Sequence, residues 1–343
     1  MQKSTRLPEF DIAKAIAFLA VILGHSSFAG VPQSIVDFCF SFHMPLFFIV
    51  SGYFLNSKSS CTSSFIKKNI RGLVIPYSVT SIFIVVLATL FTKLFQTGSV
   101  STAIQRWLPA AIYGSGVTSS SMPTGIEYIG AIWFLLALFW AKIIACELNR
   151  TNHALFYSLI LFVIGIRTSE YVWLPWSIQP AFCATMFLII GQIVKSENLL
   201  EKNGIPTTIW LCLLFAWLYC GCFYGHLSMA SNYYPDGAID VIGGVSGSLC
   251  LIKASSVIKR LLPNVSLGIA KIGSITLPLL CAHIIELDAF PWQSILNLLS
   301  RHFQVIWPFV FALQVIFTLL IALLIYFSPR ALSTIFYPSR RRQ

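Results

Sequence analysis

Stretches of about 20 mostly apolar residues recur from one end of the chain to the other, separated by short polar connections. This pattern is typical of helices that cross a lipid bilayer, and it leaves no room for a separate soluble domain. We therefore predict an all-α integral membrane protein in which residues 1–343 form a single transmembrane domain. The ten predicted helices span residues 12–29, 34–55, 72–95, 126–146, 153–168, 177–194, 207–225, 238–255, 265–287 and 306–328.

Composition supports the same class of protein. Only 10% of the 343 residues are charged and 57% are hydrophobic, whereas a soluble domain carries about 25% charged residues. The first apolar segment contains Lys14 and His25 and lacks a small-residue cleavage site, so we do not expect a signal peptide. The nine cysteines lie mostly in apolar segments without a C-x-x-C pair, so we expect neither disulfides nor a metal site.

The distribution of lysine and arginine predicts the orientation. With ten helices, one side of the membrane holds only Lys93, Arg106, Arg167 and Arg301. Lys14 and Lys271 lie within helices. The remaining lysines and arginines, from Lys3 to Arg342, fall on the other side. Since such residues favour the cytoplasm, both termini are predicted to be cytoplasmic. The net charge of +11 is then a topology signal, and we expect no nucleic-acid partner.

One connection is long, covering residues 96–125, and it is rich in serine, threonine and glycine. We expect it to be partly disordered or to form a lid.

The first helix carries polar side chains whose spacing suggests a functional site. Lys14 and His25 are eleven residues apart, which places them ~20° apart around a helix and ~16 Å apart along it. Asp11 lies one turn before Lys14 and could pair with it. Lys14 could simply reach the membrane surface and His25 could bond a neighbouring helix. An imidazole that shares a face with a cation also suits proton transfer.

Three further groups could join this stripe. His43 lies in the second helix, two residues before Pro45, which should kink that helix, and it could share a cavity with His25 or make a helix–helix contact. Lys68 and Arg71 share a face before the third helix and suit a phosphate, or serve only as inner-side charge. In the ninth helix Glu286 could orient His283, and Ser274 begins the same segment.

The runs "DIAKAIAFLAVILGHS", "FHMPLFFIVSGYFL" and "KKNIRGLVIPY" resemble the acyltransferase-3 family of membrane acyltransferases, especially bacterial glycan O-acetyltransferases related to fucose 4-O-acetylase. "IWFLLALF" and "GSITLPLLCAHIIE" resemble its later blocks. The family's motif of arginine or lysine, ten residues and histidine fits Lys14 and His25. Its Arg-x-x-Arg motif maps onto Lys68 and Arg71, with lysine at the first position. Its S-G-x-F-L block matches Ser51–Leu55.

The resemblance implies ten helices in a bacterial inner membrane and transfer of acetyl from cytoplasmic acetyl-CoA to a cell-surface polysaccharide or its lipid-linked precursor. Lys68, Arg71 and Lys14 would then bind the donor. His25 would act as general base or as an acylated nucleophile, with Asp11 holding Lys14. His43, His283, Glu286 and Ser274 are acceptor-site candidates.

Two other classes of protein fit the same composition. A transporter of a glycan or an acyl-bearing precursor would also hold polar groups at depth, although no matching pair of interrupted helices is apparent in the two halves. A non-catalytic membrane receptor is a further alternative. Turnover of acetyl-CoA by protein in detergent would separate an enzyme from both.

Overall fold

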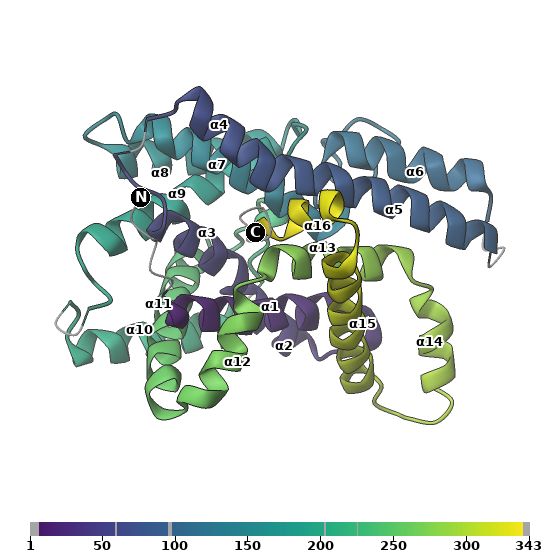
Figure 1. Ribbon diagram of the computed structural model, residues 1–343. Coiled ribbons are helices and arrows are strands. Elements are labelled where there is room, and N and C mark those ends of the chain that lie inside the picture. Colours follow the sequence, from purple (N-terminus) through teal and green to yellow (C-terminus); the bar gives the residue numbers. More distant parts are fainter. Residues whose placement is uncertain (1–6, 59, 95–97, 202–203, 225, 339–343) are drawn as a thin grey trace.

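The computed structural model describes residues 7–58, 60–94, 98–201, 204–224 and 226–338 (Figure 1). The regular elements of these residues are all helices, without a β-strand. The elements are, in chain order, α1 (Pro8–His25), η1 (Ser26–Ala29), α2 (Gln33–Phe40), α3 (His43–Tyr53), α4 (Ser63–Asn69), η2 (Ile70–Val74), α5 (Ile75–Leu94), α6 (Val100–Tyr113), η3 (Gly130–Ile132), α7 (Trp133–Leu148), α8 (Ala154–Ser169), α9 (Ile178–Ser196), α10 (Thr207–Phe223), η4 (Met229–Ser231), α11 (Ala238–Leu261), α12 (Pro263–Gly273), α13 (Thr276–Ala289), α14 (Trp292–Leu299), α15 (Trp307–Phe327) and α16 (Arg330–Phe336).

The predicted class is confirmed: this is an all-α protein with many membrane-spanning helices. Among the described residues, seven helical segments are long and apolar enough to cross a membrane, and the bent pair α12–α13 would add an eighth. The shorter apolar helices α8 and α10 lie where two more spans were predicted. The count of ten spans and the cytoplasmic position of both termini stay predictions. Several cations behind the predicted orientation lie outside the described residues: Lys3, Arg6, Lys202, Arg340, Arg341 and Arg342.

The second predicted helix, 34–55, corresponds to one candidate membrane span, Gln33–Tyr53, which is interrupted at residues 41–42 between α2 and α3. Pro45 explains the break, since a proline ring clashes with the carbonyl group four residues earlier, here that of Ser41. Side chains satisfy carbonyl groups beside the break: His43 Nδ1 donates to Cys39 at 2.6 Å and Ser41 Oγ donates to Phe38 at 2.7 Å. The break is thereby tolerated inside a membrane.

The ninth predicted helix, 265–287, is wrong as a single helix. Its two parts, α12 and α13, meet at an angle of 63°. Pro278 lies four residues after Ser274, so its ring excludes a straight helix there. Ser274 Oγ donates to the carbonyl of Lys271 at 2.7 Å and so bonds back into the last turn of α12.

A third proline distorts a helix without breaking it. Pro76 lies four residues after Gly72, and Gly72 lies in the π-helical turn Ile70–Val74. The wider turn absorbs the proline, and the helix continues as α5. The helix that was predicted to begin at residue 72 therefore begins earlier, at Ser63, through α4 and η2.

Part of the long connection is helical, as α6, so the expectation of disorder is wrong for that part, whereas a lid stays a prediction. Residues 96 and 97 of this connection lie outside the described residues. Trp107 and Ala110 of α6 are buried, and Tyr77 of α5 donates through its hydroxyl to the carbonyl of Ala111 at 2.6 Å. α6 packs on α5 because its apolar residues gather on one face. The loop that follows is also fixed, since Trp173 Nε1 donates to Ser115 Oγ at 2.9 Å.

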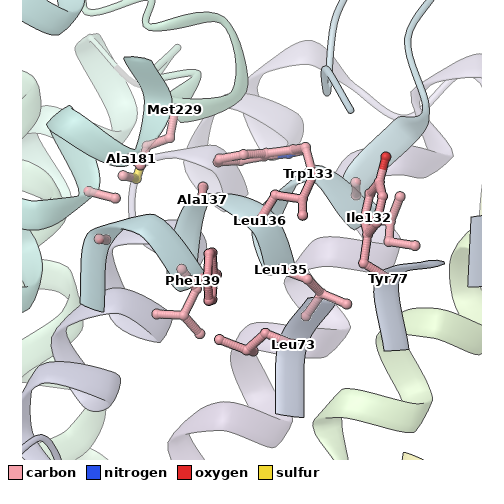
Figure 2. Packing of buried hydrophobic residues seen from close by; sticks show 14 of the residues in the cluster. Leu73, Tyr77, Ile132, Trp133, Leu135, Leu136, Ala137, Phe139, Ala181 and Met229 are labelled. Carbon is pink, nitrogen blue, oxygen red and sulfur yellow. The ribbon is translucent and has the colours of Figure 1, made fainter. Parts of the chain in front are cut away.

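The core lies around α7 and α9. Figure 2 shows side chains of α7, among them Leu135 and Phe139, close to Leu73 of η2, with Ala181 of α9 nearby. α9 also packs on α3 at very short range. A Cβ atom on Gly52 would lie 1.9 Å from the carbonyl oxygen of Leu188, and one on Gly191 would lie 2.0 Å from that of Ile49. Only glycine permits this crossing, which holds α3 in place beside α7.

Candidate functional site

A cavity of about 1000 Å³ opens between α1, α3, α4, α7 and α13. Apolar side chains form most of its wall, as in many ligand sites. Its charged and polar lining residues are Lys14, His25, His43, Ser51, Lys68, Asn69, Tyr128, Lys142, Ser228, Thr276, Asp288 and Gln293. The common face expected for Lys14 and His25 is thus the face of α1 that borders this cavity.

The cavity has two distinct ends because its helices run along it. At the start of α1, Phe10 packs on Tyr53 at the end of α3, with ring centroids 4.4 Å apart. At the other end of α1, the His25 ring lies near Phe40, with centroids 6.1 Å apart, and Phe40 lies 5.0 Å from His43. Lys14 therefore borders one end of the cavity, and His25 and His43 lie together much further along.

The first end is cationic. Lys14 of α1, Lys68 and Asn69 of α4, and Lys142 of α7 line the cavity. The contact between the start of α1 and the end of α3 assigns Lys14 to this end, and α4 follows α3 closely in the chain. Lys142 lies within electrostatic range of Lys68. On α7, Lys142 lies nine residues after Trp133, or ~14 Å along the helix. Three ammonium groups around one opening attract a polyanion, since their fields add in a partly desolvated site. We call this opening the lysine end.

Lys14 is held by an ion pair, as its spacing from Asp11 suggested. Lys14 Nζ lies 2.8 Å from Asp11 Oδ1, and the two side chains are 22% and 14% exposed. Helix α12 fixes the start of α1, because a Cβ atom on Gly273 would overlap the Asp11 carbonyl oxygen at 1.6 Å. The pairing keeps the ammonium group of Lys14 at the cavity wall.

His25 is prepared to accept a proton. Its Nδ1 donates to the carbonyl of Val21 at 2.7 Å, and a carbonyl can only accept. The proton of the neutral ring therefore lies on Nδ1, and Nε2 carries the lone pair. Because His25 lines the cavity, it supplies a base within it. His43 is fixed in the same way, through Nδ1 and the carbonyl of Cys39.

His283 and Glu286 form a buried pair behind this base. His283 Nδ1 donates to Glu286 Oε1 at 2.7 Å, and neither side chain is exposed. The His283 ring lies edge-on to His25 with centroids 5.6 Å apart, and its Nε2 has no hydrogen-bond partner among the described residues. Neither residue borders the cavity. Their position favours an effect on His25 over direct contact with a ligand.

A second polar contact holds the end of α1. Ser26 Oγ, next to His25, donates to Gln314 Oε1 of α15, and both side chains are fully buried. Trp292 Nε1 of α14 donates to the carbonyl of Glu286 at 3.0 Å. The imidazole of His25 is thus set by α13, α14 and α15 together, which lie more than 250 positions away in sequence.

Besides Asp11, His283 and Glu286, two further candidates from the sequence do not border the cavity. Arg71 is exposed and is not a lining residue, although Lys68 one turn earlier is. Ser274 lies in the bend before α13, while Thr276, two residues later, lines the cavity. Their predicted roles in donor and acceptor binding stay predictions.

Several lining residues were not selected from the sequence. Lys142 was counted only as an inner-side charge, although it interrupts an apolar run, which was the available signal. Asp288 follows Glu286 by two residues, and Tyr128, Trp133 and Trp292 come from separate elements that only the fold brings together. In the part of the chain that is described, no group of three or more potential ligands could hold a metal ion.

Comparison with known proteins identifies the family. Residues 7–327 match the acyltransferase domain of the acyltransferase-3 family. The nodulation protein NolL of Sinorhizobium fredii (strain NBRC 101917 / NGR234) is 28% identical over 222 residues, which are 60% of this chain and 56% of that protein. The chain therefore matches little more than half the length of this relative. No solved structure matches it. The chain belongs to the acyltransferase-3 family of membrane acyltransferases.

Proposed function

We propose that this protein is an O-acetyltransferase that moves acetyl from cytoplasmic acetyl-CoA to a hydroxyl group of a cell-surface polysaccharide or its lipid-linked precursor, in the inner membrane of a bacterium. One observation carries the proposal. A single cavity has three lysines at one end and, deep within it, an imidazole with Nε2 available as a base.

The lysine end suits the nucleotide part of acetyl-CoA. That part carries several phosphate charges, and ammonium groups bind phosphate as point charges. Lys14, Lys68 and Lys142 would hold it, with Arg71 as a candidate from outside the cavity wall. The ~16 Å between Lys14 and His25 along α1 suits an extended pantetheine arm, which would bring the thioester to the imidazole.

His25 would supply the chemistry. Its Nε2 takes the proton of the acceptor hydroxyl while the oxygen attacks the thioester carbonyl carbon. The carbon–sulfur bond breaks, and the imidazolium returns the proton to the departing thiolate, so that the products are an acetyl ester and free CoA. An acyl-histidine on Nε2 is the alternative, in which a second base must deprotonate the acceptor. His43, which lines the cavity and is bonded through Nδ1 to the carbonyl of Cys39, is the candidate for that task.

The test is turnover by the purified full chain in detergent, supplied with radiolabelled acetyl-CoA and the glycan fraction of its own cells. The proposal expects label in glycan O-acetyl groups without a sealed membrane. A transporter would give none under these conditions, and neither would a receptor.

A further inference from the structure

The end of the cavity opposite the lysines has its own chemistry. Asp288 lies five residues after His283 on α13, or ~7 Å further along the helix, and it lines the cavity. It faces η3, since a Cβ atom on Gly130 would lie 2.9 Å from Asp288 Oδ2. Gly130 has a φ of 76°, a backbone conformation that favours glycine. The missing side chain of Gly130 also leaves space for the Asp288 carboxyl group.

One oxygen of the Asp288 carboxyl group lacks a hydrogen-bond partner. This oxygen, Oδ2, is buried, and the carboxyl group forms no ion pair with any described residue. A buried polar group without partners is costly, most of all in a protein surrounded by lipid. A carboxylate accepts hydrogen bonds and donates none. A cavity-lining carboxylate in this state suits a ligand that brings hydroxyl groups.

Aromatic side chains border the same end. Tyr128 precedes η3, Trp133 begins α7 and Trp292 begins α14, and all three line the cavity with Gln293. A sugar ring presents an apolar C–H face and a rim of hydroxyl groups. Aromatic rings suit the face, while carboxylate and amide groups suit the rim. This combination differs from the lysine end, which has the cations and no acid among its lining residues.

We propose that Asp288, Gln293, Tyr128, Trp133 and Trp292 form the subsite that binds the acceptor sugar ring, and that Asp288 accepts hydrogen bonds from two neighbouring ring hydroxyls. This inference rests on the proposed transfer to a carbohydrate and names the residues that would select the carbohydrate acceptor. The position fits the chemistry, because His283 lies beside His25 and Asp288 follows it on the same helix.

The experiment compares Asp288→Asn with the unchanged full chain in detergent, using radiolabelled acetyl-CoA and the glycan fraction of the producing cells. Loss of a charge-assisted hydrogen bond should raise the glycan concentration needed for half-maximal transfer about tenfold or more. The KM for acetyl-CoA should stay within about twofold. Gln293→Ala, at an exposed position, should raise the same glycan concentration by a smaller factor. Glu127→Gln is the matched control, because Glu127 is a nearby acid outside the cavity lining and should leave both values unchanged.

The outcomes separate the two proposals. Suppose that the unchanged chain transfers label and that Asp288→Asn and Gln293→Ala need the same glycan concentration for half-maximal transfer. That result would overturn the subsite and leave the proposed function intact. Equal losses for glycan and acetyl-CoA in Asp288→Asn would assign Asp288 a structural role and also overturn it. If Asp288→Asn does not elute as a single species, Gln293→Ala decides the matter. No label transfer by the unchanged chain would contradict the proposed function itself.

Discussion

The rings of His25 and His283 lie edge-on with centroids 5.6 Å apart, although 258 positions separate them in the sequence. His25 borders the cavity, whereas His283 lies wholly buried behind it and is bonded to Glu286. Two imidazoles so close together in a membrane protein, one with a carboxylate partner, point to control of a proton. We interpret His283 and Glu286 as positioning residues that act through His25.

Glu286→Gln should therefore slow turnover with little effect on binding. The substitution keeps the shape of the side chain but replaces the carboxyl group that holds the His283 ring through Nδ1. We expect kcat to fall by about 10²-fold, at the lower end of the effect of a general acid–base group. The KM values for acetyl-CoA and glycan should change by less than about threefold, and the pH dependence of kcat should shift. If Glu286→Gln lowers both kcat and the midpoint of thermal unfolding, and the pH dependence of kcat does not shift, Glu286 has only a structural role.

Lys142 should contribute to donor binding, although its position in the sequence indicated only an inner-side charge. Lys142→Gln removes one of the three ammonium groups at the lysine end, and we expect the KM for acetyl-CoA to rise about tenfold. The glycan dependence should stay the same. Lys67→Gln is the control, since Lys67 is exposed next to Lys68 and does not line the cavity. If both variants raise the KM equally, the effect comes from general surface charge.

Gly52 should be essential for packing and not for chemistry. Gly52→Ala would place a methyl group against the Leu188 carbonyl of α9, and overpacking of this kind costs about 1–3 kcal/mol or more. We expect a lower midpoint of thermal unfolding in detergent. Gly268→Ala, on α12, meets no atom within 4 Å and should change that midpoint little. An unchanged midpoint for Gly52→Ala would contradict the close α3–α9 crossing.

Hydropathy alone was sufficient to locate most of the helices, because lipid requires long apolar segments with internally bonded backbones. Breaks within helices were harder to predict. Pro45 was recognised as a kink, yet Pro278 and Pro76 act by the same clash with the preceding turn and were not. The amphipathic helix α6 was missed because its connection also contains many serines and glycines, which suggested irregular structure.

The site was predictable where one helix carries it. Helical spacing placed Asp11, Lys14 and His25 on a common face, and an i, i+3 spacing paired His283 with Glu286. Contacts between distant helices were not predictable in this way. Sequence offers no signal that Lys142 joins Lys68, or that Asp288 meets Gly130, because those distances depend on how α4, α7 and α13 pack.

The central claim is that His25 performs the transfer, and the direct measurement is glycan O-acetylation by His25→Gln. The variant should reach normal abundance in the membrane and still bind acetyl-CoA at the lysine end, while the rate of label transfer falls by about 10²–10⁴-fold. His153→Gln, at an exposed histidine just before α8, provides the matched control and should transfer label at the normal rate. Transfer at the normal rate by His25→Gln would contradict the account.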